Sequence, residues 1–145
     1  MGFLSKLFGG ASPEEKAATA AAKAEARARR EAEEQAEKAA EAEALLGQAM
    51  GLDPAHASLD ARRKAAIKLV LKNQTELGRE AWLSISRDFP TELPDALEQV
   101  GVCYHLDKNY RAALENYEAA IRLGANADHL ADNIAEARKG LAAVG

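Results

Sequence analysis

The sequence predicts an all-α protein, on three observations. Helix start and stop signals recur at short intervals through residues 53–145. Residues 14–46 consist almost wholly of strong helix formers and contain no Gly or Pro. No stretch shows the sustained alternation of apolar and polar residues that is typical of a half-buried strand.

The composition excludes several classes of protein. The chain has 145 residues, of which 48% are hydrophobic and 29% charged, as in a globular protein. Its net charge of −4 argues against nucleic-acid binding, because phosphate contacts need a surplus of Lys and Arg. The single cysteine excludes an intrachain disulfide and fits a reducing cytoplasm. No apolar run approaches the roughly 20 residues of a membrane-spanning helix.

Composition also divides the chain into three segments. Residues 1–13 form a short apolar head, residues 14–46 a charged, Ala-rich tract, and residues 53–145 hold nearly all the large apolar side chains. A weak break over residues 47–54 separates the second segment from the third. We therefore expect one helical domain that follows a long helix and a short amphipathic head.

The head carries four large apolar residues that fall on one face of a helix: Phe3, Leu4, Leu7 and Phe8. Ser5 and Lys6 lie on the opposite side. Large apolar side chains ahead of a polar helix predict an anchoring segment. Its target would be a membrane surface, a partner protein or the groove of another copy, and the alternative is a short extension without a role.

The charged tract predicts a long solvated helix. Of its 33 residues, 14 are Ala, 9 are Glu and 6 are Lys or Arg. Pairs such as Glu25–Arg29 and Glu34–Lys38 each contribute about 0.2–0.5 kcal/mol. At roughly 1.5 Å per residue, the helix extends about 50 Å. Because Leu45 and Leu46 are its only large apolar residues, a spacer is favoured over a weak alanine coiled coil, a partner-binding helix or disorder.

Capping signals define the helices of residues 53–145. Asp53 precedes a proline, Asn73 and Glu76 resemble a capping box, Asn109 is a further cap, and Gly124 is typical of a helix end. We expect helices near 54–72, 74–88, 92–106, 110–123 and 127–141. Their short connections make successive helices antiparallel neighbours.

Two stretches of these helices repeat one pattern, 35 positions apart. The later copy contains Leu97, Val100, Gly101, Tyr104, Ala113, Tyr117 and Ala120. The earlier and weaker copy contains Arg62, Ala65, Ala66, Leu69, Gly78, Trp82 and Ile85. Gly101 and Ala113 are small where two helices would cross closely, and Tyr104 and Tyr117 would fill the space beside the crossing.

This pattern resembles the tetratricopeptide repeat family over about residues 59–141. The beginning of a third copy, with Ala131, Ile134 and Ala135, is similar to the closing helix of such arrays. Arg62 departs from the family pattern, which has a large apolar residue there, and Ala125 replaces the closing proline that the earlier copy retains as Pro90.

The resemblance implies an inner groove lined by the first helix of each unit. Its residues by position are Arg63, Ile67, Val70, Asp95, Glu98, Val102 and His105, followed by Asp132 and Glu136 of the closing helix. Ile67 and Val102 stand where some family members need an asparagine to clamp a terminal carboxylate. We therefore expect the groove to bind an amphipathic helix or an extended apolar peptide, unless its apolar residues belong to the core.

Two repeats and a closing helix make a marginal core, because about three units are usual. We expect either that the helix ending near Gln48 packs on the first repeat or that the protein self-associates. Lys64, Lys68 and Lys72 recur at i,i+4, which favours a solvated face over a docking stripe for an acidic helix or anionic lipid.

No residue pattern indicates catalysis. None of His56, His105 and His129 has a convincing second metal ligand, and the His129–Asp132 pair is a weak one. Cys103 lies among apolar residues and is expected to be an inert buried thiol. We expect no metal, no cofactor and no enzyme activity.

The segments together predict a non-catalytic cytoplasmic adaptor or scaffold. Its repeat domain would bind a protein partner, and the charged helix would hold the head away from that domain for attachment to a membrane surface or a second protein. The alternatives are a self-assembling scaffold, in which the head docks in the groove of a neighbouring copy, and a small chaperone for an apolar substrate. A metal- or cofactor-dependent enzyme is the remaining class.

Overall fold

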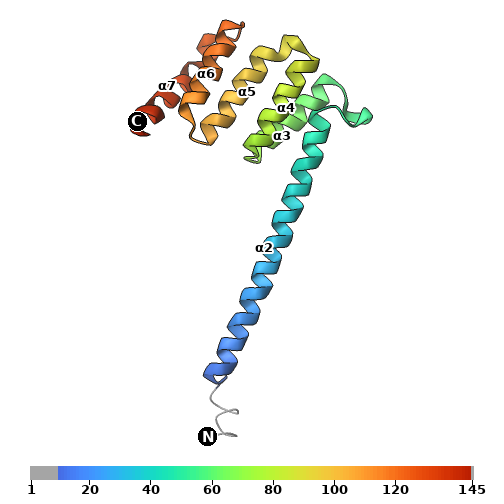
Figure 1. Ribbon diagram of the computed structural model, residues 1–145, viewed down its shortest axis with the longest axis vertical. Helices are drawn as coiled ribbons and strands as arrows, with labels where there is room; N and C mark the ends of the chain where they lie inside the picture. Colours follow the sequence, from blue (N-terminus) through green and yellow to red (C-terminus); the bar gives the residue numbers. More distant parts are fainter. Residues whose placement is uncertain (1–9, 145) are drawn as a thin grey trace. The chain divides into compact units, whose positions relative to one another are not determined.

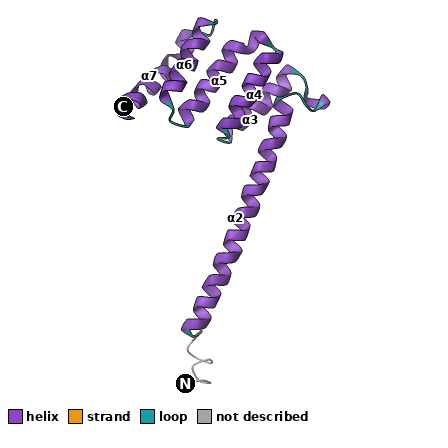
Figure 2. Ribbon diagram, viewed as in Figure 1, coloured by secondary structure: helices purple, strands orange, loops and turns teal. Residues whose placement is uncertain are grey.

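The computed structural model describes residues 10–144, so the expected head residues Phe3, Leu4, Leu7 and Phe8 lie outside the described part. The described residues form α-helices and two short 3₁₀ helices, with no strand among them, which confirms the all-α prediction (Figure 1; Figure 2). The helices are α2 (Pro13–Ala49), η1 (Pro54–His56), α3 (Leu59–Leu71), α4 (Thr75–Asp88), η2 (Pro90–Glu92), α5 (Leu93–Leu106), α6 (Tyr110–Arg122) and α7 (Ala127–Val144). The chain divides into two compact units, Met1–Ala40 and Glu41–Gly145.

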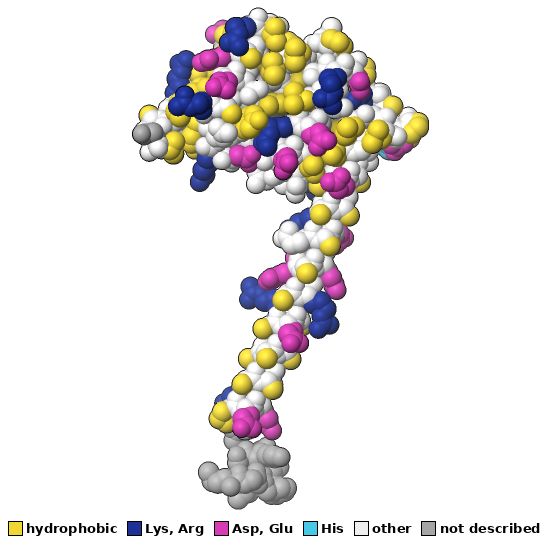
Figure 3. Space-filling model, viewed as in Figure 1, with side chains coloured by type: hydrophobic (Ala, Val, Ile, Leu, Met, Phe, Trp, Pro, Cys, Tyr) yellow, Lys and Arg dark blue, Asp and Glu magenta, His cyan; other side chains and the backbone are white. Residues whose placement is uncertain are grey.

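The part of α2 in the first unit is a solvated helix, as the charged tract predicts. Ser12 and Glu15 form a reciprocal cap, in which the Ser12 Oγ accepts from the Glu15 N–H at 3.2 Å and a Glu15 carboxylate oxygen accepts from the Ser12 N–H at 3.1 Å. Every residue from 13 to 41 is exposed. Alanine and charged side chains alternate along this helix in Figure 3. Arg27 and Glu31 form an i,i+4 ion pair at 2.9 Å on its surface.

The end of α2 belongs to the core of the second unit. Four of its side chains are buried in one cluster with residues of α3, α4 and α5: Ala42, Leu45, Leu46 and Ala49. The helix continues through Gly47, where the sequence suggests a break, and ends before Gly51, whose φ is +75°. The buried leucines explain the difference, because their packing outweighs the low helix propensity of one glycine. The expectation that this helix packs on the first repeat is confirmed.

Two predicted helix starts differ from the structure. Asp53 caps only the short η1, by accepting from the Ala55 N–H at 3.0 Å, and Ser58 caps α3 by accepting from the Ala61 N–H at 3.2 Å. Asn73 does not cap α4. Its φ of 59° instead places it in the left-handed turn that ends α3, which is a conformation that asparagine tolerates better than most residues.

The 35-residue repetition is visible in the backbone and in the core. Asn73 and Lys108, 35 positions apart, have φ values of 59° and 61° and follow α3 and α5 in the same way. The residue after each donates to a carbonyl five positions back, from Gln74 to Leu69 and from Asn109 to Tyr104, each at 2.9 Å. The repeated sequence positions therefore fold into repeated local structure.

Successive helices from α3 to α7 pack side by side, which confirms the predicted neighbours (Figure 1). Trp82 of α4 and Tyr117 of α6 occupy equivalent positions and are 1% and 0% exposed. Gly101 of α5 meets Tyr117 so closely that an added Cβ would lie 2.7 Å from the tyrosine ring. The close helix crossing predicted at Gly101 is therefore present.

Arg62 is the one residue of the earlier repeat whose side chain departs from the apolar pattern, and it is buried. Its Nε donates to the Ala49 carbonyl at 2.7 Å and its guanidinium contacts the Ser84 hydroxyl at 3.3 Å. It also pairs with Asp88 at 2.8 Å and lies over the Phe89 ring, 5.3 Å from the centroid. Because the last carbonyls of a helix lack partners within it, Arg62 supplies one for the end of α2.

Candidate functional site

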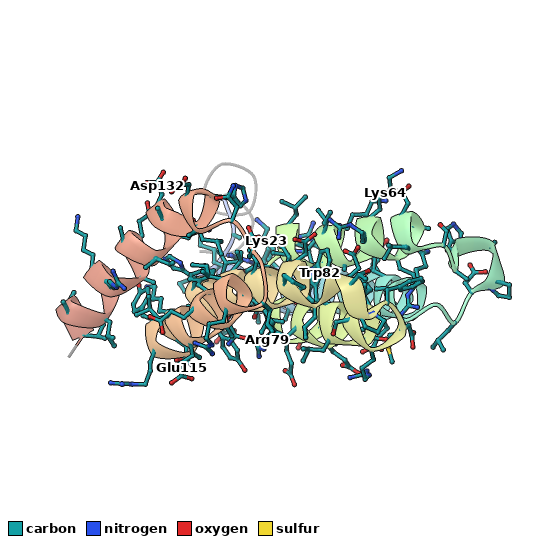
Figure 4. The ribbon with its side chains drawn as sticks, turned by 90° about the horizontal axis from the view of Figure 1, so that it is seen from above. Lys23, Lys64, Arg79, Trp82, Glu115 and Asp132 are labelled. Carbon is teal, nitrogen blue, oxygen red and sulfur yellow. The ribbon has the colours of Figure 1, made fainter. Side chains whose placement is uncertain are left out.

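The first helices of the hairpins share one face of the second unit. In Figure 4, Lys64 of α3 and Asp132 of α7 lie on one side, and Arg79 of α4 and Glu115 of α6 lie on the opposite side. The predicted groove residues come from α3 and α5, with Glu136 and Asp132 from α7. They thus lie on alternate helices of the second unit, α3, α5 and α7.

One apolar pocket on this unit includes predicted groove residues. It has a volume of about 220 Å³ and is formed by α5, α6 and α7; its lining residues are Val102, His105, Leu106, Tyr117, Asn133 and Glu136. We call it the α5–α7 pocket. Val102 and His105 are predicted groove residues, and Glu136 is the predicted acidic residue of the closing helix.

The inner wall of the α5–α7 pocket is a neutral phenol next to an imidazole. The Tyr117 Oη lies 3.2 Å from the His105 Nδ1, and the two rings meet at 63° with centroids 6.2 Å apart. Burial raises the pKa of Tyr117 to about 12, and the negative charges of Glu98 and Glu136 act in the same direction. At neutral pH the hydroxyl stays protonated, so it acts as a hydrogen-bonding group and not as a base or nucleophile.

Ion pairs between the helices occupy other predicted groove residues. Arg63 of α3 pairs with Glu92 and with Asp95, 3.2 Å away, and stacks over Trp82 at 5.3 Å. These ion pairs balance the charge of Arg63, so this predicted groove residue is not a free basic group. The structure does bring Arg63 and Asp95 together, as neighbours across the α3–α5 boundary.

The acidic groove residues Glu98, Asp132 and Glu136 differ in their contacts. The Glu98 carboxylate of α5 lies 3.0 Å from the His129 Nε2, and this contact links α5 to α7. Among the described residues, neither Asp132 nor Glu136 lies within ion-pair distance of a basic group. Glu136 therefore gives the lining of the α5–α7 pocket a carboxylate without a basic partner among the described residues.

The predicted apolar residues of α3 divide between surface and core. Ile67 is 40% exposed. Val70 packs instead against α4, where an added Cβ on Gly78 would lie 3.1 Å from its Cγ2. Val102 is half-buried and packs against the cluster of α6 and α7. The core alternative is thus correct for Val70, and Ile67 stays available at the surface.

Two exposed leucines were missed by the sequence analysis. Leu71 of α3 is 80% exposed, and Leu106 of α5 is 49% exposed and lines the α5–α7 pocket. They are 35 positions apart, and each lies one helical turn after Ile67 or Val102. Both leucines could have been identified from the sequence by moving one helical turn, four residues, beyond Ile67 and Val102.

The lysines of α3 form ion pairs on their own surface. Lys64 pairs with Asp60 at 3.0 Å, and Lys72 pairs with Glu41 at 2.9 Å. All four side chains are largely exposed, so each pair is weak. This arrangement favours the solvated-face interpretation, since two of the three lysines already face carboxylates.

The thiol and imidazole groups show no catalytic arrangement within residues 10–144. Cys103 is fully buried, and burial raises the pKa of its thiol to about 11. The described residues contain no group of three or more His, Cys, Asp or Glu that could hold a metal ion. His129, the candidate partner of Asp132, contacts Glu98 instead. None of the described helices is both long and apolar enough to span a membrane.

Comparisons with protein-family models, curated proteins and solved structures found no match for this chain. The tetratricopeptide-like interpretation therefore depends on the residues themselves: the 35-position register, the small residues at the helix crossings and the buried aromatic residue of each second helix.

Proposed function

We propose that residues 53–145 form a tetratricopeptide-type interaction domain whose first-helix face binds an amphipathic helix of a protein partner. The α5–α7 pocket carries this proposal. Its apolar wall contains Leu106, which is 49% exposed, and Val102, and its rim holds the carboxylate of Glu136. A pocket that combines apolar wall residues with a few polar groups is typical of a binding site.

The remaining exposed apolar side chains of the face support an extended contact. Ile67 and Leu71 are 40% and 80% exposed on α3. They repeat the positions of Val102 and Leu106 one hairpin earlier. A helix that presents apolar residues three and four positions apart would bury these side chains, each worth roughly 1.5–3 kcal/mol when fully covered.

The exposed part of α2 would serve this adaptor as a spacer. Its residues from 13 to 41 are exposed, and its end is fixed in the core of the second unit through Leu45, Leu46 and Arg62. A continuous helix keeps its two ends at a more nearly constant distance than a flexible linker does.

The test is a matched pair of substitutions in the full chain, Leu106→Glu and Leu83→Glu. Both leucines are exposed, at 49% and 37%, but Leu83 lies on α4 and does not line the α5–α7 pocket. We expect a photo-crosslinker at Val102 to capture a partner in cells that make the protein, and Leu106→Glu to abolish the crosslink while Leu83→Glu retains it.

Circular dichroism melts of both variants provide the control, since neither substitution removes a buried side chain. Equal melting temperatures would show that loss of the crosslink comes from the pocket itself. A crosslinked partner that persists in Leu106→Glu would refute the proposal, as would equal crosslinking from positions 102 and 83.

A further inference from the structure

The α5–α7 pocket selects for an occupant with apolar side chains and positive charge. Leu106 and Val102 provide apolar surface, and Glu136, the carboxylate that lines the pocket, has no basic partner among the described residues. Burial is the main cause of the raised pKa of Tyr117, and the negative charges of Glu98 and Glu136 add to it. An acidic or wholly polar segment would be repelled or left without apolar contact.

The chain itself contains a segment with this chemistry. Residues 1–13 hold no Asp or Glu, one lysine, and four large apolar residues on one helical face: Phe3, Leu4, Leu7 and Phe8. On such a helix Lys6 would lie on the opposite side, and a lysine stem is long enough to bring its ammonium group round to the rim of a site that the apolar face enters. The charged tract that follows offers no comparable surface, since its leucines, Leu45 and Leu46, are buried.

We propose that residues 1–10 of one copy bind the α5–α7 pocket of a second copy. This inference depends on the proposed function of the pocket and names its occupant. The contact joins two different surfaces of the same protein, so each bound copy still presents a free head or a free pocket. Such a heterologous contact extends from copy to copy unless the arrangement closes into a ring.

Sedimentation velocity of the full chain over a concentration series tests the proposal. We expect assembly that grows with concentration and a loss of at least about tenfold in association constant for Leu7→Glu and for Leu106→Glu. Leu83→Glu is the matched control and should assemble as the wild type does. A chain that remains monomeric throughout, or assembly that is unchanged by Leu106→Glu, would overturn the proposal.

Charge reversal tests the pairing more directly. Lys6→Glu and Glu136→Lys should each weaken assembly, and the two substitutions in one chain should restore it. A synthetic peptide of residues 1–10 should compete and return the wild type to monomer. Failure of the double variant to recover, or of the peptide to compete at about 1 mM, would count against the contact.

The two proposals can fail separately. If the chain is monomeric and a crosslinker at Val102 captures a different protein, the occupant is wrong and the pocket remains an interaction site. If the chain is monomeric and binds vesicles of anionic phospholipid through Leu7, the head is a membrane anchor and the second-copy contact is excluded. If the chain assembles and Leu106→Glu abolishes both assembly and the crosslink, both proposals stand.

Discussion

Replacing the buried Arg62 by methionine should separate the end of α2 from the rest of the second unit. Arg62 is 4% exposed and contacts two other helices at once, α2 through Ala49 and α4 through Ser84 and Asp88. Methionine has a similar length and retains most of the apolar contact. The substitution therefore removes the hydrogen bonds and leaves the packing largely in place.

The expected loss of stability is about 2–4 kcal/mol. The carbonyl of Ala49, a fully buried residue, would lose the donor at 2.7 Å, and an unsatisfied buried carbonyl costs about 1–3 kcal/mol. The longer contact with Ser84, at 3.3 Å, adds a smaller amount. Asp88 is 55% exposed, so its pair with Arg62 adds about 0–1 kcal/mol. Relief of the cost of burying a charge reduces the sum.

Arg63→Met is the matched control, because the same substitution falls on the next residue of the same helix. The Arg63 side chain is 33% exposed and its partners Glu92 and Asp95 are 17% and 55% exposed, so its loss should cost about 1–2 kcal/mol, less than that of Arg62. Urea unfolding followed by circular dichroism gives both values, and Arg62→Met should lower the melting temperature by roughly 10–25 °C. Hydrogen exchange should show the added loss of protection in the last turns of α2. Equal destabilisation by the two variants would refute the role assigned to Arg62.

Three further measurements follow from the core. Gly101→Ala should destabilise the protein by about 1–3 kcal/mol, because the added Cβ would lie 2.7 Å from the buried Tyr117 ring. Gly47→Ala should stabilise it by about 0.5–1 kcal/mol, because nothing lies within 4 Å of the added Cβ at that helical position. The midpoints of urea unfolding test both predictions. Cys103 should react with a thiol reagent only as fast as the protein opens, and a fast reaction in the native state would contradict its burial. The pKa of Cys103 is raised from 9.0 to about 11, and that of Tyr117 from 10.0 to about 12. As the pH rises, the unfolded state therefore loses these two protons before the folded state does. The contribution of these two groups to the free energy of unfolding is complete below about pH 9 and decreases between about pH 9 and 12. Tyr117→Phe should make the decrease less steep in the upper part of this pH range.

The helices were predictable because their signals are local. Asn109 caps α6 as expected, by accepting from the Ala112 N–H at 3.3 Å, and Gly124 ends that helix with a φ of +112°. Asn73 was assigned the wrong role because the same residue type serves helix starts and left-handed turns. Choosing between them required the conformation of the loop, which the position 35 residues later, Lys108, shares.

The candidate site was only partly predictable, since exposure depends on how neighbouring helices pack. Ile67 and Val70 are both apolar residues of α3, but Val70 packs at Gly78 of the next helix and Ile67 does not. The resemblance to the repeat family placed both on the inner face. The ion pair of Arg63 with Asp95 joins residues 32 positions apart, and no local pattern specifies such a contact.

Helix α2 explains both why position 62 is an arginine and how the small domain completes its core. Two hairpins and a closing helix leave the first repeat with an uncovered face, and α2 covers it with Leu45, Leu46 and two buried alanines. A helix end placed there brings carbonyl groups into an apolar site, where they need a donor. A large apolar residue at position 62 could not provide one, whereas the Arg62 Nε reaches the Ala49 carbonyl and its charge is shared with Asp88 near solvent. The residue that fits the repeat pattern least is thus the one that the added helix requires.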